Sequence, residues 1–327
     1  MKRAASLLIA AWLALPGAAD SAPLRIVAPE AAFDSVHTAT AMPTQPGNAP
    51  ATGIVQTADS LAALRRLADE SAPALGAITA DLPQGLAVGA YPREPHLAAS
   101  ASRLRVIAPL QREQMYFIVR ADATLQYIDE IAGARINVGP ANSDAARTVE
   151  TLYALMFGSR PDTSHESFLD DEDALVRLVS DMSIDVVVVL ATPPAKLLTS
   201  MKPESRRYIK FLKLARDHPS TRRLLGTYVA TPMRASNYRN LLVDDVPTLG
   251  VESYLVTAAP DTGPVAQTLV GLARTWCATS GGPLDAVAGM REGSALPKLA
   301  RGWSWYPPTA EELDVCASAH AAARSTY

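Results

Sequence analysis

The segment GPANSDAA at residues 139–146 combines residue types and a spacing that suit the binding of a ligand oxygen. A Gly-Pro turn follows a short extended run and leads into an amphipathic helix with apolar residues at 149, 152, 153 and 156. The N–H groups of a first helical turn have no acceptor within their own helix. The backbone of residues 142–146 is therefore predicted to offer N–H donors and a helix dipole to a solute.

Two side chains of this segment also have a purely structural interpretation. Ser143 is of a type favoured at helix N-caps, and Asp144 would be an acidic residue in the first turn. Such an acidic residue stabilises a helix by about 0.3–1 kcal/mol through the dipole. The residue types alone do not separate capping from ligand binding.

Motifs of catalysis or cofactor binding do not occur in the sequence. It has no GxSxG, P-loop or GxGxxG pattern, and its five histidines have neither HxH nor HExxH spacing. The acidic run at 170–173 lacks the alternating ligands of a calcium loop and is predicted to open a helix. We expect no enzyme activity, no cofactor and no metal site.

The first 19 residues have the pattern of a cleaved signal peptide. Lys2 and Arg3 precede an apolar run that ends at Leu15, and small residues follow before the predicted cut after Ala19. The run is shorter than the roughly 20 residues that span a membrane. Cleavage would leave a net charge of 28 − 33 = −5, which excludes nucleic acid as a partner. The protein is predicted to be exported to the periplasm, and its length suits two lobes.

Cys277 and Cys316 are the two cysteines of the chain, and neither belongs to a CxxC motif. In an exported protein such a pair is most simply a disulfide, although two buried free thiols are the alternative. In the chain-entropy model a loop of this length is worth about 4 kcal/mol of stability.

The periodicity of the chain predicts an α/β fold with parallel sheets. Residues 53–81 form a strand, a helix with Ser60 at its N-cap and a second strand, which is a βαβ unit. A second series includes the helix after Gly139 and the buried strand with four consecutive valines at 186–189. Two separate extended runs, at 104–107 and 115–120, a strand at 248–257 and a helix at about 262–277 complete the pattern. The GWSWYPP segment at 302–308 is predicted to be an extended tail that packs its rings onto the fold; an aromatic surface for a partner or a sugar is the alternative.

Three segments give the chain a resemblance to a known family. Residues 104–146, the run LVSDMSIDVVVVLATPP at 178–194, and residues 228–260 with VPTLGVESYLVT resemble the TAXI family of periplasmic solute-binding proteins, which serve TRAP transporters. The resemblance implies a two-lobed type II periplasmic binding protein fold with mainly parallel sheets and a two-crossover hinge. Lobe one would comprise residues 24–112 and 233–327, lobe two residues 113–232, and the ligand would lie in the cleft.

The same resemblance supplies the candidate ligand-binding residues. Gly139 and Ser143 fit the turn that precedes the family's cleft helix, whereas Asn142 and Asp144 depart from that pattern. Other positions match the end of a lobe-one strand, the end of the valine strand and a cleft tyrosine. The predicted ligand-binding residues are Thr79, Asp81, Gly139, Asn142, Ser143, Asp144, Thr192 and Tyr238.

Lobe one departs from the family in the segment APEAAFDSVHTATAM at residues 28–42. The family has a glycine-rich loop with a tyrosine there, and this chain has no glycine and has Phe33 at about the tyrosine position. The expected cleft also presents Glu30, Asp34, Asp81 and Asp144. An organic anion is then disfavoured unless Arg112, Arg147 or Arg234 reaches in, so a small zwitterion or polar solute is as well supported as an anion.

Two functions follow from these patterns. The first is a solute-binding protein that captures a small polar solute, either an organic anion or an amino acid-like molecule, and delivers it to a TRAP-type membrane permease by hinge closure. Such a protein is expected to be mostly open without its ligand. The alternative, motivated by the glycine-poor segment, is a periplasmic sensor or interaction subunit that keeps the fold and signals to a membrane sensor partner.

Overall fold

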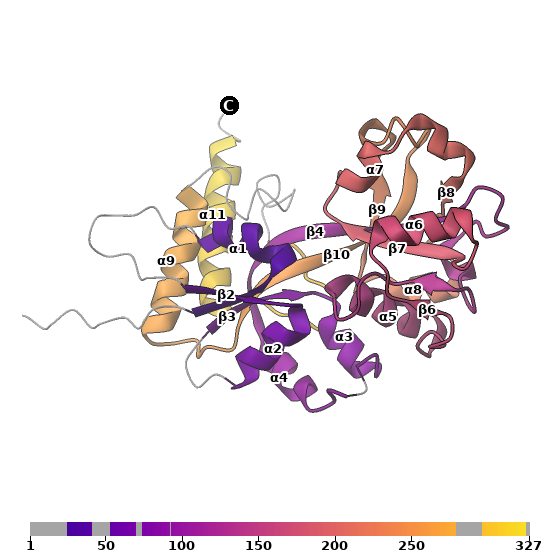
Figure 1. Ribbon diagram of the computed structural model, residues 1–327. Helices are drawn as coiled ribbons and strands as arrows, with labels where there is room; N and C mark the ends of the chain where they lie inside the picture. Colours follow the sequence, from indigo (N-terminus) through magenta and orange to yellow (C-terminus); the bar gives the residue numbers. More distant parts are fainter. Residues whose placement is uncertain (1–24, 41–52, 70–73, 92, 279–295, 325–327) are drawn as a thin grey trace, which may run out of the picture.

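The computed structural model of the protein describes residues 25–40, 53–69, 74–91, 93–278 and 296–324. The predicted signal peptide at 1–19 lies outside the described residues. Within the described ranges, no helix is long and apolar enough to cross a membrane. Figure 1 shows two lobes, as the resemblance implies, and they are joined by two long strands.

The strands form one continuous sheet path that passes through both lobes. Its order is β2-β1-β3-β10-β4-β7-β5-β6, with β8 on β4 and β9 on β10. Pairing is parallel among β1, β2 and β3 and again among β5, β6 and β7, so each lobe has the predicted parallel sheet. The strands are β1 (Arg25–Pro29), β2 (Gly53–Thr57), β3 (Ala74–Thr79), β4 (Arg105–Arg120), β5 (Ile136–Asn137), β6 (Glu166–Ser167), β7 (Val186–Ala191), β8 (Ile209–Phe211), β9 (Val229–Met233) and β10 (Val246–Thr257).

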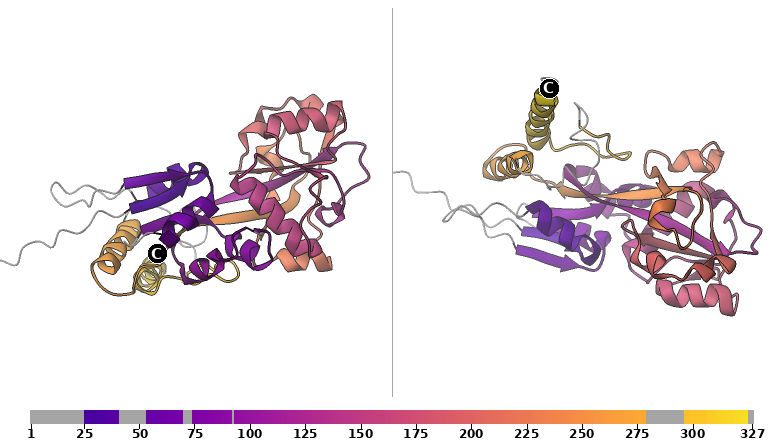
Figure 2. Two further views of the ribbon diagram at one scale, coloured as in Figure 1. Left: turned by 60° about the horizontal axis from the view of Figure 1, so that its bottom comes forward. Right: turned by 90° about the horizontal axis from the view of Figure 1, so that it is seen from above.

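Strands β4 and β10 form the connection between the lobes. They are antiparallel neighbours with Leu249 opposite Met115 near one end and Thr257 opposite Arg105 at the other. The prediction of two separate extended runs in 104–120 was wrong, because the intervening residues continue the ladder and make β4 one strand of 16 residues. Figure 2 shows the two strands running side by side between the lobes.

Lobe one packs helices on both faces of the sheet β2-β1-β3-β10-β4. One face carries α1, α9 and α11, and the other carries α2, α3 and α4. Residues 30–40, at the place of the family's glycine-rich loop, form a short 3-10 turn and then α1. The helices are α1 (Phe33–Thr40), α2 (Ser60–Asp69), α3 (Leu82–Ala87), α4 (Leu97–Arg103), α9 (Pro264–Ala278) and α11 (Pro307–Arg324).

Lobe two repeats this arrangement around β4, β5 and β7. The valine strand β7 is buried on both faces, as its apolar run predicts, and α6 opens at the acidic run, as its residue types predict. Helix α5 covers one face of the sheet and α6 the other. The helices are α5 (Asp144–Phe157), α6 (Asp171–Ser180), α7 (Lys196–Ser200) and α8 (Pro219–Leu224).

The apolar clusters indicate where the chain passes between the lobes. Leu110 on β4 packs in a lobe-one cluster and Met115 in a lobe-two cluster. On β10, Val251 packs with lobe two and Tyr254 with lobe one. These clusters favour a second crossing within β10, later than the predicted position at 232/233. The division of the chain into lobes stays a proposal.

The predicted extended tail at 302–308 is non-helical as far as Tyr306, with Trp305 in a β-bridge to Val106, and a helix begins at its two prolines. Tyr306 is fully buried in the lobe-one core, and Trp303 donates its indole N–H to Ala80 O at 2.7 Å, so the aromatic residues pack as expected. The prediction was wrong for the two prolines, because Pro307 begins α11, a position where the missing N–H of proline costs nothing. Helices α9 and α11 lie side by side (Figure 1) and carry Cys277 and Cys316. The side chain of Cys316 is not described, so the disulfide stays a prediction.

Candidate functional site

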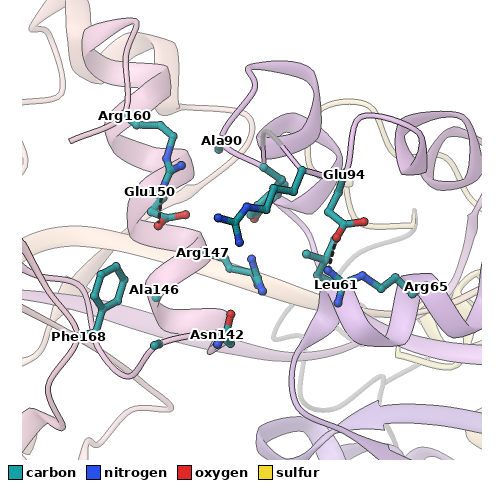
Figure 3. Close-up of a pocket in the computed structure, with 13 residues that line it drawn as sticks. Leu61, Arg65, Ala90, Glu94, Asn142, Ala146, Arg147, Glu150, Arg160 and Phe168 are labelled. Atoms are coloured by element: carbon teal, nitrogen blue, oxygen red, sulfur yellow. Dashed lines mark hydrogen bonds and ion pairs between the residues drawn. The ribbon is translucent and has the colours of Figure 1, made fainter. Parts of the chain in front are cut away.

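A pocket of about 430 Å³ lies between the two lobes, within the size range of small-molecule sites. Lobe one contributes α2 and the loop between α3 and α4, and lobe two contributes α5 and the segments that flank β6. Figure 3 shows Arg65 and Glu94 facing Arg147 and Glu150 across this space. The lining residues are Leu61, Arg65, Ala90, Tyr91, Arg93, Glu94, Ala141, Asn142, Ala146, Arg147, Glu150, Arg160 and Phe168.

The amino end of α2 is organised by Asp59 and Ser60. Asp59 Oδ1 accepts the N–H of Ala62 at 2.6 Å, so Asp59 is the capping residue and the prediction of Ser60 as N-cap was wrong by one position. Ser60 Oγ is thereby left to accept the N–H of Thr79 at 3.0 Å. This places the end of β3 directly against the start of α2.

The amino end of α5 meets the amino end of α2 across the cleft. Ser143 is the N-cap of α5, because its Oγ accepts the N–H of Ala146 at 3.1 Å. The Asp144 carboxylate crosses to lobe one and accepts from Ser60 N at 2.8 Å and from Ser60 Oγ at 3.1 Å. Asp144 therefore joins the two lobes instead of serving only the dipole of its own helix.

The turn before α5 uses two residues with positive φ. Gly139 has φ 93° and Asn142 has φ 60°, and asparagine is among the few residues that tolerate this region. The N–H of Ser143 bonds to Pro140 O at 3.2 Å. Since the N–H of Ala146 is also taken by the cap, two of the five backbone donors predicted for a solute are used within the turn.

Arginine side chains dominate the charge of the pocket. Four arginines and two glutamates line it, which gives a formal charge of 4 − 2 = +2. Arg65 pairs with Glu94, and Arg160 Nη2 lies 2.8 Å from Glu150 Oε1. Among the described residues, Arg93 has no side-chain partner. Because Asp59, which lies outside the lining, pairs with Arg147, the charge of Arg93 is the one that no ion pair balances, and this charge suits an anion.

Arg147 holds a central place between the lobes. Its Nε lies 2.5 Å from Oδ2 of the buried Asp59, and its guanidinium lies 5.6 Å from the ring centroid of Tyr91. The side chain is therefore fixed by an ion pair and by a cation–π contact, both made with lobe one. Arg147 is the one arginine named at the sequence level that lines the pocket.

Carboxylates beside the pocket are buried and hold their protons more tightly than usual. Burial raises the pKa of Asp144 to about 7, an effect that Asp59 reinforces and the bonds from Ser60 oppose. Burial, together with Asp144 and Asp81, raises the pKa of Glu113 to about 7. Burial likewise raises the pKa of Asp81, although the Tyr228 hydroxyl lies 2.9 Å from its Oδ2. The lobe junction is therefore sensitive to pH near neutrality.

The predicted ligand-binding residues fall into three groups in the structure. Asn142 lines the pocket, and the turn residues Gly139 and Ser143 position it. A second group lies beside the pocket at the lobe junction, close to where α2 meets α5. It consists of Thr79, Asp81 and Asp144.

Tyr238 and Thr192 lie away from this group. Tyr238 is fully buried in lobe two, where its hydroxyl lies 2.6 Å from the Tyr116 hydroxyl and accepts from Ala195 N at 2.8 Å. Thr192 is exposed just after β7 and does not line the pocket. Neither residue lines this pocket, and a role in ligand binding stays a prediction for both.

Sequence reasoning missed Arg65, Arg93, Arg160 and Tyr91. Arg65 lies on α2, and Arg160 follows α5. Tyr91 and Arg93 lie in the loop between α3 and α4, and no motif joins the four residues. The one usable signal is local: Gly158, with φ 79°, ends α5, so the chain turns back and brings Arg160 to Glu150. In the described part of the chain, no group of three His, Cys, Asp or Glu side chains is suited to a metal ion.

Comparison with protein families identifies a family for this chain. The NMT1-like family matches residues 53–266, well over half of the chain, and this region contains both amino-terminal ends that meet at the cleft. The protein belongs to the NMT1-like family. No curated protein sequence matches it significantly.

Solved structures of periplasmic binding proteins are similar at low identity. MatC from Rhodopseudomonas palustris with bound malate is 15% identical, with 92% of this chain and 98% of that chain covered and a TM-score of 0.45. A TctC solute-binding protein from Polaromonas is 13% identical (94% and 99% covered, TM-score 0.44). The aliphatic sulphonate-binding protein SsuA from Escherichia coli is 14% identical (90% and 84% covered, TM-score 0.41). At these values none of them assigns a ligand to this NMT1-like chain.

Proposed function

We propose that this protein is an exported solute-binding protein that takes a small organic anion into the pocket between its lobes. The observation that carries the proposal is the lining of four arginines, of which Arg93 has no side-chain partner among the described residues. The sequence-level condition for an anion, that an arginine reach the cleft, is met by Arg147. Glu30 and Asp34, which argued against an anion, do not line the pocket.

Delivery to a membrane transporter is the second part of the proposal. The resemblance to TAXI proteins supports a TRAP-type permease as the partner, and the apolar amino-terminal run supports export to the periplasm. Closure of two lobes over a solute provides the mechanism, since a ligand that contacts both lobes stabilises the closed state by its differential affinity. The pocket meets this requirement because Arg93 and Arg147 come from different lobes.

Calorimetric titration tests the proposal directly. The protein without residues 1–19 would be titrated with succinate, 2-oxoglutarate and methanesulfonate, and with glycine and glucose as a zwitterion and a neutral solute. We expect an anion to bind, and Arg93→Ala to weaken that binding about tenfold or more, because a charge-assisted hydrogen bond is lost. Arg216→Ala removes an exposed arginine outside the pocket and is the matched control. Binding of glycine or glucose but of no anion would overturn the proposal.

A further inference from the structure

The pairing of charges in the pocket limits the charge that a solute can carry. Three of the four pocket arginines are each held by a carboxylate of the protein, and Arg93 has no such partner among the described residues. The three pairs are Arg65–Glu94, Arg160–Glu150 and Arg147–Asp59. The pairing leaves one positive charge for a solute, that of Arg93.

Two of these pairs contain a carboxylate that is more buried than its arginine. The side chain of Asp59 is 3% exposed and that of Arg147 is 17% exposed. The side chain of Glu150 is 10% exposed and that of Arg160 is 34% exposed. A solute carboxylate that drew either arginine away would leave a buried carboxylate without its counter-charge, which is strongly unfavourable. Both arginines are therefore committed to the protein.

The third pair places negative charge on the lobe-one wall of the pocket. Arg65 Nη2 bonds to Glu94 Oε1, and Glu94 lines the pocket together with Arg65 (Figure 3). The bond from Arg65 lowers the pKa of Glu94, so this carboxylate is ionised at neutral pH. A solute carboxylate that approached Arg65 would be repelled by Glu94.

The lobe junction beside the pocket is also acidic. The Asp144 carboxylate accepts from Ser60 N and Oγ there. Burial, assisted by the charges of Asp59 and Asp81, raises the pKa of Asp144 to about 7. A second negative charge on a solute would add to the repulsion among these groups.

Paired arginines can still bind an uncharged group. A guanidinium has several N–H donors, and one ion pair does not use all of them. A hydroxyl, keto or amide oxygen could accept from Arg147 or Arg160 without displacing the carboxylate partner. The pocket thus suits a solute with one acidic group and a neutral oxygen elsewhere.

We propose that the pocket selects organic monoanions, with the acidic group on Arg93 and a neutral oxygen on the paired arginines. Glu94 and Glu150 are then the specificity-determining residues, because they neutralise arginines that would otherwise bind a second acidic group. This inference rests on the proposed function and narrows it to one charge class of solute.

Calorimetric titration with solutes of different charge tests this selection. Succinate and 2-oxoglutarate are the dianions, and succinamate and methanesulfonate are the monoanions. Succinamate is the monoamide of succinate and matches its size, so we expect it to bind about tenfold or more tightly than succinate. Burial raises the pKa of Glu150, and the charge of Arg160 opposes this shift. The titrations are therefore made at about pH 8, where both carboxylates of succinate are also ionised.

The outcomes separate this inference from the proposed function. A dianion that binds as tightly as the tightest monoanion would overturn the inference and leave the proposed function standing. If none of the four anions binds, the proposed function fails and the inference fails with it.

Glu150→Gln tests one specificity residue. Glutamine keeps an oxygen that accepts from Arg160 but removes the charge, so Arg160 becomes available to a second acidic group. We expect the ratio of the Kd of succinate to that of the tightest monoanion to fall by about tenfold. Asp185→Asn is the matched control, because Asp185 Oδ1 pairs with Arg135 Nη2 at 2.6 Å in lobe two, outside the pocket. An unchanged ratio in a Glu150→Gln protein that keeps the wild-type circular dichroism spectrum would contradict the role of Glu150.

Discussion

Burial of carboxylates at the lobe junction predicts an unusual dependence of stability on pH. The native pKa of Asp144 is about 7 because of burial, whereas an exposed aspartate has a pKa near 4. The folded protein therefore binds more protons than the unfolded chain between these values. A raised native pKa gives a contribution to stability that is complete below the unfolded pKa and is lost as the pH rises through the folded one.

The size of the effect follows from the two pKa values. We consider a group whose pKa is about 4 in the unfolded chain and about 7 in the native state. As the pH rises from 5 to 7, such a group lowers the free energy of unfolding by about 2 kcal/mol. Glu113 has the same native pKa and adds a contribution in the same direction, reduced because Asp144 is one cause of its shift. The wild-type protein should therefore be less stable at pH 7 than at pH 5.

Urea unfolding of wild-type and Asp144→Asn protein at pH 5, 6 and 7 measures this contribution. Asparagine does not titrate, so the variant should gain about 2 kcal/mol relative to wild type as the pH rises from 5 to 7. Asp245→Asn is the control: the N–H of Ala235 and then Arg234 lower the pKa of Asp245, so its titration lies below this range. A constant difference between wild type and Asp144→Asn from pH 5 to pH 7 would refute the reasoning.

Three other predictions concern the same junction and the carboxyl-terminal helices. Arg160→Met should destabilise the protein by about 1–2 kcal/mol in urea unfolding, because it leaves the buried Glu150 without its ion-pair partner; an unchanged midpoint would contradict this. Gly85→Ala should cost about 1–3 kcal/mol, since the new Cβ would lie 2.5 Å from Thr151 Oγ1, whereas Gly53→Ala meets nothing within 4 Å and should be nearly neutral. Peptide mass spectrometry should find Cys277 linked to Cys316 without reductant, and recovery of two unlinked peptides would disprove the bridge.

The sequence was sufficient to predict the elements whose periodicity depends on burial. The four valines of β7 and the apolar strand β3 at the end of the βαβ unit were recognised because a strand buried on both faces must be apolar throughout. The start of α5 was also located correctly, since a Gly-Pro turn and Ser143 mark it. The two-lobed fold came from the resemblance and not from these patterns.

The composition of the pocket could not be predicted from local patterns. Arg65, Arg93 and Arg160 are separated in the chain and are brought together only by the packing of α2 and α5 across the cleft. Tyr238 shows a related ambiguity, because a tyrosine can face a cleft or fill a core, and here its buried hydroxyl is paired with Tyr116 and Ala195. Side-chain partners across two lobes leave no periodic signal in the sequence.

The pairing of β4 with β10 also indicates where in the chain lobe two is inserted. Arg112 and Glu252 are register partners in two adjacent antiparallel strands, at the place where the apolar clusters change from one lobe to the other. If the lobes divide at this pair, as the apolar clusters favour, lobe two is an insertion at the tip of a β-hairpin of lobe one. Replacing residues 113–251 with Asn-Gly would close that hairpin by a type I′ turn and restore an uninterrupted host domain. Recombination at the two gene positions that flank residues 113–251, which encode neighbours in the sheet, would allow lobe two to be exchanged for that of a relative while the sheet of lobe one keeps its connectivity.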